Sequence, residues 1–183
     1  AHPEATRYLL SMRIKSRLIV VALVLLAAGT TPARAQRGGA TIAGGVSRYN
    51  LQGATGNGLV GAFRFEIPTR LYMIIEPSLS FLRWQPLTGT ASTHLMPELG
   101  LQVQGYVGRM HPYIGGGLGY STPTRTAPGL QQNFFTLHAA AGVRFYLTRR
   151  FGLRAEVRAR SVDPWQGTTV DMTLGIIQVP PGR

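Results

Sequence analysis

Apolar and polar residues alternate one by one over several stretches of the chain, most clearly in Phe151–Ser161. The odd-numbered residues from Phe151 to Ala159 are apolar, whereas Arg154, Glu156, Arg158 and Arg160 occupy even positions. Side chains of a β-strand point to opposite faces with a period of two residues. The stretch therefore predicts a strand with one apolar face and one charged face.

Eight segments follow one another after residue 36, separated by gaps rich in glycine and proline. Six of them alternate in this way, whereas the first and the fifth are rich in glycine and alternate less cleanly. A tilted strand needs about 9–11 residues to cross a membrane, and the segments are long enough to do so. The sequence therefore predicts an all-β fold, an eight-stranded antiparallel up-and-down transmembrane β-barrel. The predicted strands are Ala40–Tyr49, Gly58–Ile67, Leu71–Trp84, Thr93–Tyr106, Pro112–Ser121, Asn133–Leu147, Phe151–Ser161 and Val170–Val179.

The connections between these strands are predicted to alternate in length. Short connections are expected at Pro68–Arg70, Val107–His111 and Thr148–Arg150, and longer ones at Asn50–Asn57, Gln85–Ser92, Thr122–Gln132 and Val162–Thr169. Short periplasmic turns and longer external loops are typical of outer-membrane barrels. Function on such scaffolds usually resides in loops, so the longest one, with Thr122, Arg125 and Gln131, is the candidate contact surface. Its other interpretation is an ordinary solvated loop.

The charged residues decide which face of the strands points inward. An arginine or lysine facing lipid near the midplane costs about 2–4 kcal/mol, so the polar face is predicted to line the interior. An eight-stranded barrel is just wide enough for side chains to fill it, and buried charges are tolerated when they are paired. We therefore predict an interior ion-pair network. Its members are Arg64, Glu66, Glu76, Glu98, Gln102, Arg144, Arg154, Glu156 and Arg158.

The first part of the chain has the layout of a secretory signal peptide. A basic segment begins at Met12, the apolar run Leu18–Ala28 follows, and Ala33-Arg34-Ala35 is a small-x-small cleavage site. The apolar run is shorter than the roughly 20 residues of a transmembrane helix. We predict an upstream extension at residues 1–11, a signal peptide at 12–35 and the barrel at 36–183.

Composition removes several classes of function. The chain has no cysteine, so disulfides and thiolate metal sites are impossible. Residues 36–183 carry a formal charge of 14 − 6 = +8, but their arginines are spread singly along the predicted strands. Nucleic-acid binding favours clustered basic residues, so we expect no nucleic-acid partner and favour anionic outer-membrane lipids as the counter-charge.

Three segments resemble the small outer-membrane β-barrel domain family, which is similar to the transmembrane domain of outer membrane protein A and to opacity-type porin-like proteins. They are Pro112–Tyr120 (PYIGGGLGY), Gly142–Leu147 (GVRFYL) and Leu153–Arg158 (LRAEVR). The resemblance implies a bacterial outer-membrane location and insertion by the barrel-assembly machinery. It implies no particular substrate and no cofactor, because the family is functionally diverse.

Several smaller motifs have both a functional and a structural interpretation. The glycine run 115–119 lacks the following helix and Lys-Ser/Thr pair of a phosphate loop, so we expect it to relieve crowding. His94, His111 and His138 lack a metal-site spacing. Aromatic residues near strand ends are expected at the membrane interfaces: Trp84, Tyr106, Tyr120 and Trp165.

Three functions remain open, and we rank a non-enzymatic structural or loop-presenting barrel first. A narrow porin-like channel for small or hydrophobic molecules is the second. A lipid-modifying enzyme is the third, with Ser78, Ser80 and His138, or the carboxylates Glu76 and Glu98, as candidate groups on the interior face. A soluble lipocalin-like barrel would need the opposite pattern, with an apolar interior and a polar exterior.

Overall fold

The computed structural model describes residues 38–51, 54–69, 72–86, 91–125, 133–163 and 166–180. All of them belong to the compact unit Ala35–Arg183. The predicted upstream extension at 1–11 and the signal peptide at 12–35 lie outside the described residues. The strands are β1 (Gly39–Leu51), β2 (Ala54–Pro68), β3 (Met73–Pro86), β4 (Ser92–Gln104), β5 (Met110–Arg125), β6 (Phe134–Tyr146), β7 (Phe151–Val162) and β8 (Gly167–Gln178). Within the described part of the chain, no helix is long and apolar enough to cross a membrane.

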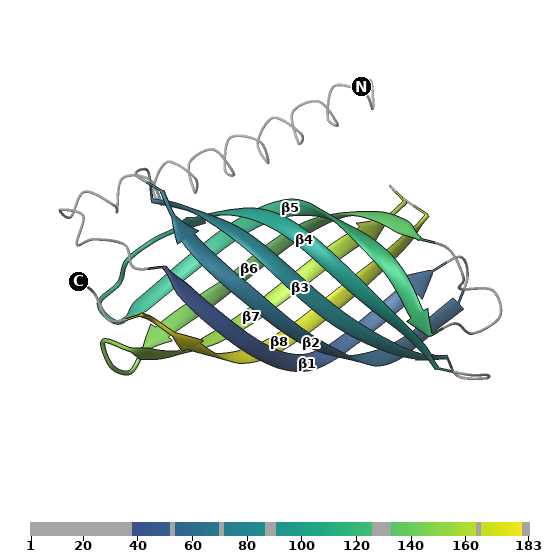
Figure 1. Cartoon of the computed structure of the whole chain (residues 1–183), viewed down its shortest axis with the longest axis horizontal. Helices are drawn as coiled ribbons and strands as arrows, with labels where there is room; N and C mark the ends of the chain where they lie inside the picture. The colour runs from purple at the N-terminus through teal and green to yellow at the C-terminus, as the bar shows by residue number, and fades with distance from the viewer. Residues whose placement is uncertain are drawn as a thin grey trace, which may run out of the picture. The chain divides into compact units, whose positions relative to one another are not determined.

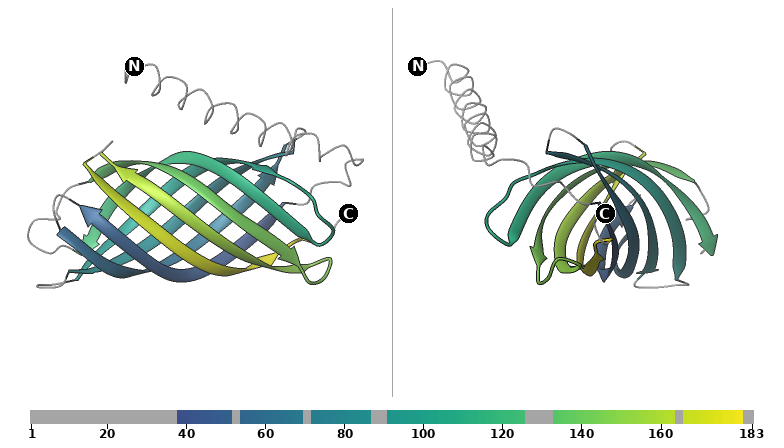
Figure 2. Two further views of the ribbon diagram at one scale, coloured as in Figure 1. Left: turned by 180° about the vertical axis from the view of Figure 1, so that it is seen from behind. Right: turned by 60° about the vertical axis from the view of Figure 1, so that its left-hand side comes forward.

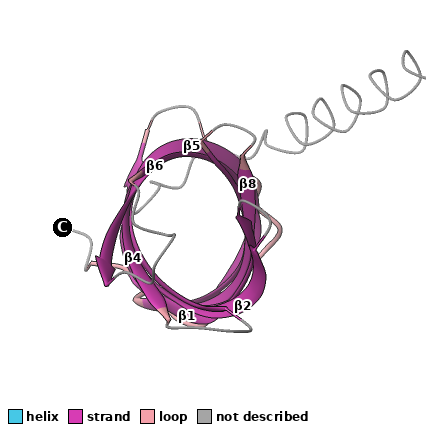
Figure 3. Ribbon diagram, turned by 90° about the vertical axis from the view of Figure 1, so that its right-hand side faces the viewer, coloured by secondary structure: helices cyan, strands magenta, loops and turns pink. Residues whose placement is uncertain are grey.

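The eight strands form one closed antiparallel barrel in which each strand pairs with its sequence neighbours and β1 also pairs with β8 (Figures 1 and 3). Figure 2 shows the yellow β8 beside the blue β1. The predicted fold class is therefore confirmed. Closure leaves no unpaired sheet edge, as a strand structure in lipid requires.

Rows of paired residues run obliquely around this barrel. The row that starts at Asn57 in β2 passes through Arg48 in β1 and Val170 in β8. It continues through the other strands and returns to β2 at Ile67, which is 67 − 57 = 10 residues farther along. Such a stagger requires tilted strands. Each row therefore descends from one end of the barrel toward the other.

We call the two ends of the barrel the inner end and the outer end. The inner end carries the start of β1, the end of β8 and the connections β2–β3, β4–β5 and β6–β7. The outer end carries the other four connections, the longest of which joins β5 to β6. Short turns face the periplasm in outer-membrane barrels, which places the inner end there.

Two predicted outer loops are much shorter than expected. Pairing of β1 with β2 continues through Tyr49↔Gly56 to Leu51↔Ala54, and β8 already begins at Gly167. The sequence at 54–58 resembles a loop because it is rich in glycine. Gly56 instead makes room inside the barrel, since a Cβ atom there would lie 2.6 Å from the Tyr49 ring. The predicted boundaries at Asn50–Asn57 and Val162–Thr169 were therefore wrong.

The candidate contact loop Thr122–Gln132 also needs correction. Thr122 and Arg125 belong to β5, where they pair with Leu95 and Thr93 of β4, while Gln131 lies outside the described residues. The register shifts between Thr93 and His94, and such a bulge accommodates a proline in a strand. The proline and threonines at 122–125 therefore led to the prediction of a loop, although the backbone continues as a strand.

The alternation itself was predicted correctly. In β7, Leu153 and Val157 are 47% and 45% exposed on the outside, whereas Arg154 and Arg158 are each 1% exposed. The remaining strands show the same division between an apolar exterior and a largely polar interior. This is the arrangement of a barrel surrounded by hydrocarbon, and it is opposite to that of a lipocalin.

Candidate functional site

Three arginines of β7 reach across the interior to carboxylates on β3 and β4. Arg154 Nη1 lies 2.5 Å from one oxygen of Glu76, and Arg158 Nη2 lies 2.8 Å from the other. Arg160 donates to the two oxygens of Glu98 at 2.7 and 2.9 Å, which is a strong bidentate geometry. Because β7 and β3 are four strands apart in a ring of eight, these side chains cross the barrel.

The Glu156 carboxylate accepts hydrogen bonds from several of these groups. Its Oε1 lies 3.0 Å from both Arg64 Nη2 and Arg158 Nε. Its Oε2 accepts hydrogen bonds from Arg154 Nη2 at 2.5 Å and from Tyr113 OH at 2.6 Å. Tyr113 OH in turn accepts a hydrogen bond from Arg154 Nε at 2.7 Å. A buried charge is tolerated only when its lone pairs and protons are used in this way.

Arg144 extends the network toward the inner end. Its Nε lies 2.7 Å from Glu66 Oε1, Nη1 donates to Gln104 Oε1 at 3.3 Å, and Nη2 donates to Gln102 Oε1. The centre of its guanidinium group lies 4.0 Å from the centre of the Tyr113 ring, a cation–π distance. All three nitrogens of this arginine are therefore used.

The buried charges cancel. Among the described residues, five arginines and five carboxylates are at most 5% exposed, although the whole chain has a formal charge of +12. The excess positive charge therefore lies outside this network. The ten buried charged residues are Arg64, Arg144, Arg154, Arg158 and Arg160, and Glu66, Glu76, Glu98, Glu156 and Asp171.

The structure brings the nine predicted network residues into one connected set inside the barrel. Sequence reasoning missed several members, among them Gln104, which accepts a hydrogen bond from Arg144. Arg160 and Asp171 form an ion pair. Both occupy positions that the odd–even alternation along their strands (parity) assigns to the polar face, and that signal could have identified them. Tyr113 lies in β5, whose glycine-rich sequence hides the alternation.

The glycine run of β5 makes room for the network. Gly115, Gly117 and Gly119 lie on the strand face that approaches network side chains. A Cβ atom at any of the three would lie 2.7 Å from a side-chain carbon, which is closer than real contacts allow. The carbons concerned belong to Gln102, His138 and Glu98, respectively. This geometry agrees with the structural interpretation of the run.

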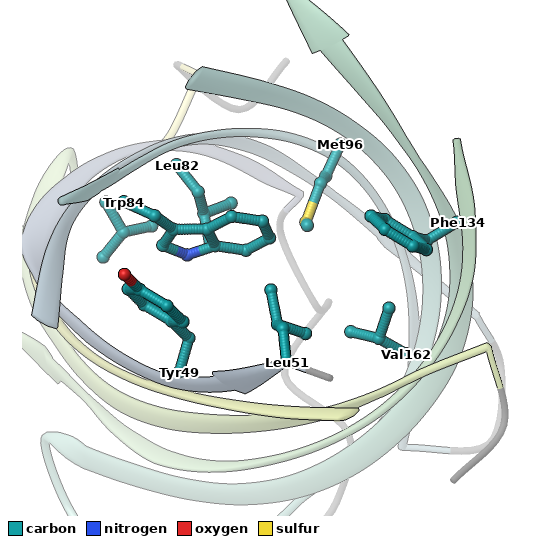
Figure 4. Close-up of a cluster of buried hydrophobic side chains, with 8 residues drawn as sticks. Tyr49, Leu51, Leu82, Trp84, Met96, Phe134 and Val162 are labelled. Carbon is teal, nitrogen blue, oxygen red and sulfur yellow. The ribbon is translucent and has the colours of Figure 1, made fainter. Parts of the chain in front are cut away.

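An apolar cluster lies at the outer end of the interior, beside the buried polar residues Ser92, His94 and Ser121. Eight buried side chains from six strands form this apolar cluster, and each is at most 4% exposed. Figure 4 shows the labelled side chains pointing toward one another from the surrounding strands. The members are Tyr49, Leu51, Val60, Leu82, Trp84, Met96, Phe134 and Val162.

Trp84 is therefore not an interfacial residue, and that prediction was wrong. Its even position places it on the interior face of β3, where its ring centre lies 4.4 Å from that of His94. Tyr120 does face outward and is 46% exposed, whereas Tyr106 packs against His111 near the inner end. Trp165 lies outside the described residues.

The histidines have separate structural surroundings. His94 Nε2 lies 2.9 Å from Ser92 Oγ, and Nδ1 lies 2.9 Å from Ser121 Oγ. His138 Nδ1 lies 3.3 Å from Glu98 Oε1, and His111 packs between two tyrosine rings. Among the described residues, no three histidine or acidic side chains gather as they would around a metal ion.

The contacts among the candidate catalytic groups do not have the order that nucleophilic catalysis requires. Ser80 Oγ donates to Glu98 Oε2 at 3.1 Å, and His138 contacts the other oxygen of the same carboxylate. Ser78 accepts a hydrogen bond from Arg158. In a catalytic triad the histidine lies between the nucleophile and the acid. Here the acid lies between the serine and the histidine.

The comparisons with known proteins agree with this architecture. The sequence pattern of the family described as outer membrane protein beta-barrel domain matches residues 19–178. The chain belongs to this family. Its place in the bacterial outer membrane follows from that membership. No curated protein matches the sequence.

Solved structures of other small outer-membrane barrels are similar in fold, among them the three that follow. Neisserial surface protein A matches with a TM-score of 0.60 and 11% identity, covering 77% of this chain and 96% of that one. Ail, the attachment invasion locus protein of Yersinia pestis, matches with 0.55 and 14%, covering 79% and 98%. The outer membrane enzyme PagL matches with 0.55 and 13%, covering 77% and 99%. One barrel architecture therefore serves a surface protein, an attachment protein and an enzyme.

Proposed function

We propose that this protein is a closed structural barrel that makes its contacts with other molecules at its outer end. The observation that carries the proposal is the double filling of the interior. Ten charged side chains occupy its middle and inner part, and the apolar cluster occupies its outer part. Ions would have to break desolvated pairs in the first region and cross a water-excluding constriction in the second.

Recording from planar lipid bilayers tests this proposal. We expect the folded protein to give no steady conductance above the lipid baseline. A double variant, Trp84→Ala with Arg158→Ala, removes a large side chain from each region and serves as the positive control for opening. Val157→Ala, on the lipid-facing side of β7, is the matched control. Steady unitary conductance of the unmodified protein would contradict the proposal.

A narrow channel is the second candidate, and one wall of the barrel favours it. In the part of the chain that the structure describes, seven buried side-chain atoms without a protein hydrogen-bond partner lie on the adjacent strands β8, β1 and β2. Ordered water usually satisfies such groups, and a file of water would begin a conduction path. The residues are Thr41, Ser47, Tyr49, Arg64, Thr169 and Asp171. If this candidate is right, Ser47→Leu lowers a conductance that the unmodified protein already has.

A lipid-modifying enzyme is less well supported, even though PagL shares the fold. The carboxylate of Glu98 lies between Ser80 and His138, and both ring nitrogens of His94 contact serines. These groups are buried inside the barrel, away from lipid. We expect phospholipid and lipid A masses to be the same in cells with and without the protein. A mass change abolished by His138→Ala or His94→Ala would favour the enzyme instead.

A further inference from the structure

A groove of about 500 Å³ crosses the outer wall of the barrel over β6, β7, β8 and β1. Two rows of paired, lipid-facing residues line it. The upper row is Val46, Met172, Val157 and Ala141, and the lower row is Gly44, Leu174, Ala155 and Val143. Every residue of these two rows is apolar, whereas Glu156 and Thr173, which also border the groove, are each 4% exposed and lie on the interior face. The groove therefore fits hydrocarbon rather than a polar ligand.

The depth of the groove comes from side-chain size. Gly44, Ala141 and Ala155 contribute little or no side chain to its floor. Met172 and Leu174, which are 58% and 72% exposed, stand out from the same wall. In the lower row small and large residues alternate across neighbouring strands, and a flexible chain could lie in the space on either side of Leu174, over Gly44 and Ala155.

A positive charge lies directly beyond the outer side of this groove. Arg48 is the next outward-facing residue of β1 after Val46, and it is exposed. Its backbone pairs with Val170 of β8 on one side and with Asn57 of β2 on the other. Among the described residues, Arg48 forms no ion pair. The following outward position of β1 is Asn50, so the surface changes here from apolar to polar.

This change from apolar to polar residues places Arg48 at the level of the lipid headgroups. An arginine near the interface costs only about 0–1 kcal/mol, whereas one at the midplane costs several times more. The paired rows descend from β1 toward β6, as the row from Asn57 to Ile67 shows. The groove therefore starts beside Arg48 near the outer end and slopes toward the middle of the membrane.

We propose that the groove and Arg48 together bind one anionic lipid of the outer leaflet. The guanidinium group pairs with the phosphate of the headgroup, and one acyl chain lies in the groove. An apolar trough with one cation at its shallow end is complementary to such a molecule in both shape and charge. The site lies on the outer wall, so it does not depend on whether the interior conducts.

Native mass spectrometry of the folded full-length barrel in detergent tests the site. The probes are phosphatidylglycerol, which is anionic, and phosphatidylcholine with the same acyl chains, which has no net charge. We expect one phosphatidylglycerol to bind with about tenfold higher affinity, the size of one charge-assisted contact. Arg48→Gln should abolish this preference. Arg83→Gln, which changes another outward-facing arginine near the outer end, should leave the preference unchanged.

Filling the groove should weaken binding of both lipids. Gly44→Leu is suitable because a Cβ atom there would meet only Val60 O, at 3.9 Å. Gly61→Leu is the matched control, since a Cβ atom there has no atom within 4 Å and Gly61 does not line the groove. Ala155→Leu is a second groove-filling variant if Gly44→Leu fails to fold. The shift in gel mobility on heating identifies folded barrels.

Three results would overturn the proposal. The first is equal affinity of the unmodified protein for both lipids. The second is an equal loss of preference in Arg48→Gln and Arg83→Gln, which would indicate diffuse electrostatic attraction. The third is a dimer in the spectrum that Gly44→Leu converts to monomer without changing lipid binding, because the groove would then hold a second copy of the chain.

Discussion

The interior of the barrel has two regions that are filled by different physical means. In the ion-pair network each side chain has assigned partners, as when Arg158 donates to Glu76, Glu98 and Glu156 from three different nitrogens. In the apolar cluster, side chains such as Leu82 and Met96 pack against neighbouring side chains without assigned partners. The network therefore depends on direction and charge, and the cluster depends mainly on volume.

This difference affects how each region tolerates change. Burying a charge is costly, so loss of one partner leaves the others uncompensated. Apolar side chains of similar volume can replace one another at small cost. Substitutions in the two regions should therefore differ most when they preserve size or charge. The following predictions refer to the free energy of unfolding, measured by reversible urea titration in lipid vesicles.

The largest effect is expected for Arg154→Ala. This change removes a cation that contacts Glu66, Glu76 and Glu156, and breaking a buried ion pair costs about 3–5 kcal/mol. Arg149→Ala, in the exposed turn between β6 and β7, should change stability by less than about 0.5 kcal/mol. Similar losses in both variants would show that the network does not stabilise the barrel.

Arg158→Lys should be costly although it keeps the charge. One ammonium group cannot reproduce three N–H groups directed at three carboxylates, and each hydrogen bond to a charged group contributes about 1.5–3 kcal/mol. We expect a loss of about 2–3 kcal/mol. The control is Arg83→Lys on the outer wall, where the same change should be nearly neutral. A neutral Arg158→Lys would mean that total charge, rather than direction, governs the network.

Gly117→Ala should cost about 1–3 kcal/mol, because the added methyl group would overlap the Leu99 carbonyl oxygen and lie 2.7 Å from the His138 ring, and neither can shift freely. Gly61→Ala places the same methyl group where no atom lies within 4 Å. That variant should be as stable as the unmodified protein or slightly more stable. Equal effects at the two glycines would contradict the crowding that we infer inside the barrel.

The smallest effect is expected for Met96→Leu in the apolar cluster. The two side chains have nearly the same volume, so the loss should stay below about 1.5 kcal/mol. This loss should be clearly smaller than the loss for Arg158→Lys. Met96→Leu preserves volume in the cluster, just as Arg158→Lys preserves charge in the network. A larger loss at Met96 would show that the cluster is as specific as the network.

Parity along the strands predicted much of this structure. It gave the number of strands, their lipid-facing residues and the inward position of charges such as Arg144 and Glu98, because a misplaced charge in lipid is expensive. Parity alone would also have placed Trp84 inside, but the usual place of tryptophan at membrane interfaces suggested otherwise. Position near a strand end was the weaker signal, because these strands continue beyond the membrane-spanning length.

Other features could not be predicted from parity. It assigns a side chain to the interior but not to a partner, so the contact of Arg160 with Asp171 and Glu98 depends on the stagger of the whole barrel. Strand ends were misjudged at Gly56 and Thr122 because glycine and proline there serve packing and a bulge rather than a turn. Tyr113 was missed because its glycine neighbours obscure the alternation.

The equal number of buried arginines and carboxylates has a consequence for engineering. Charged rings give pores their preference for cations or anions. A passage cut through this scaffold by trimming uncharged side chains would start without such a preference. Removal of a single arginine would then favour cations, and removal of a single carboxylate would favour anions. The same protein could thus yield one pore that prefers cations and one that prefers anions. Each would differ by one substitution from a parent pore without a preference.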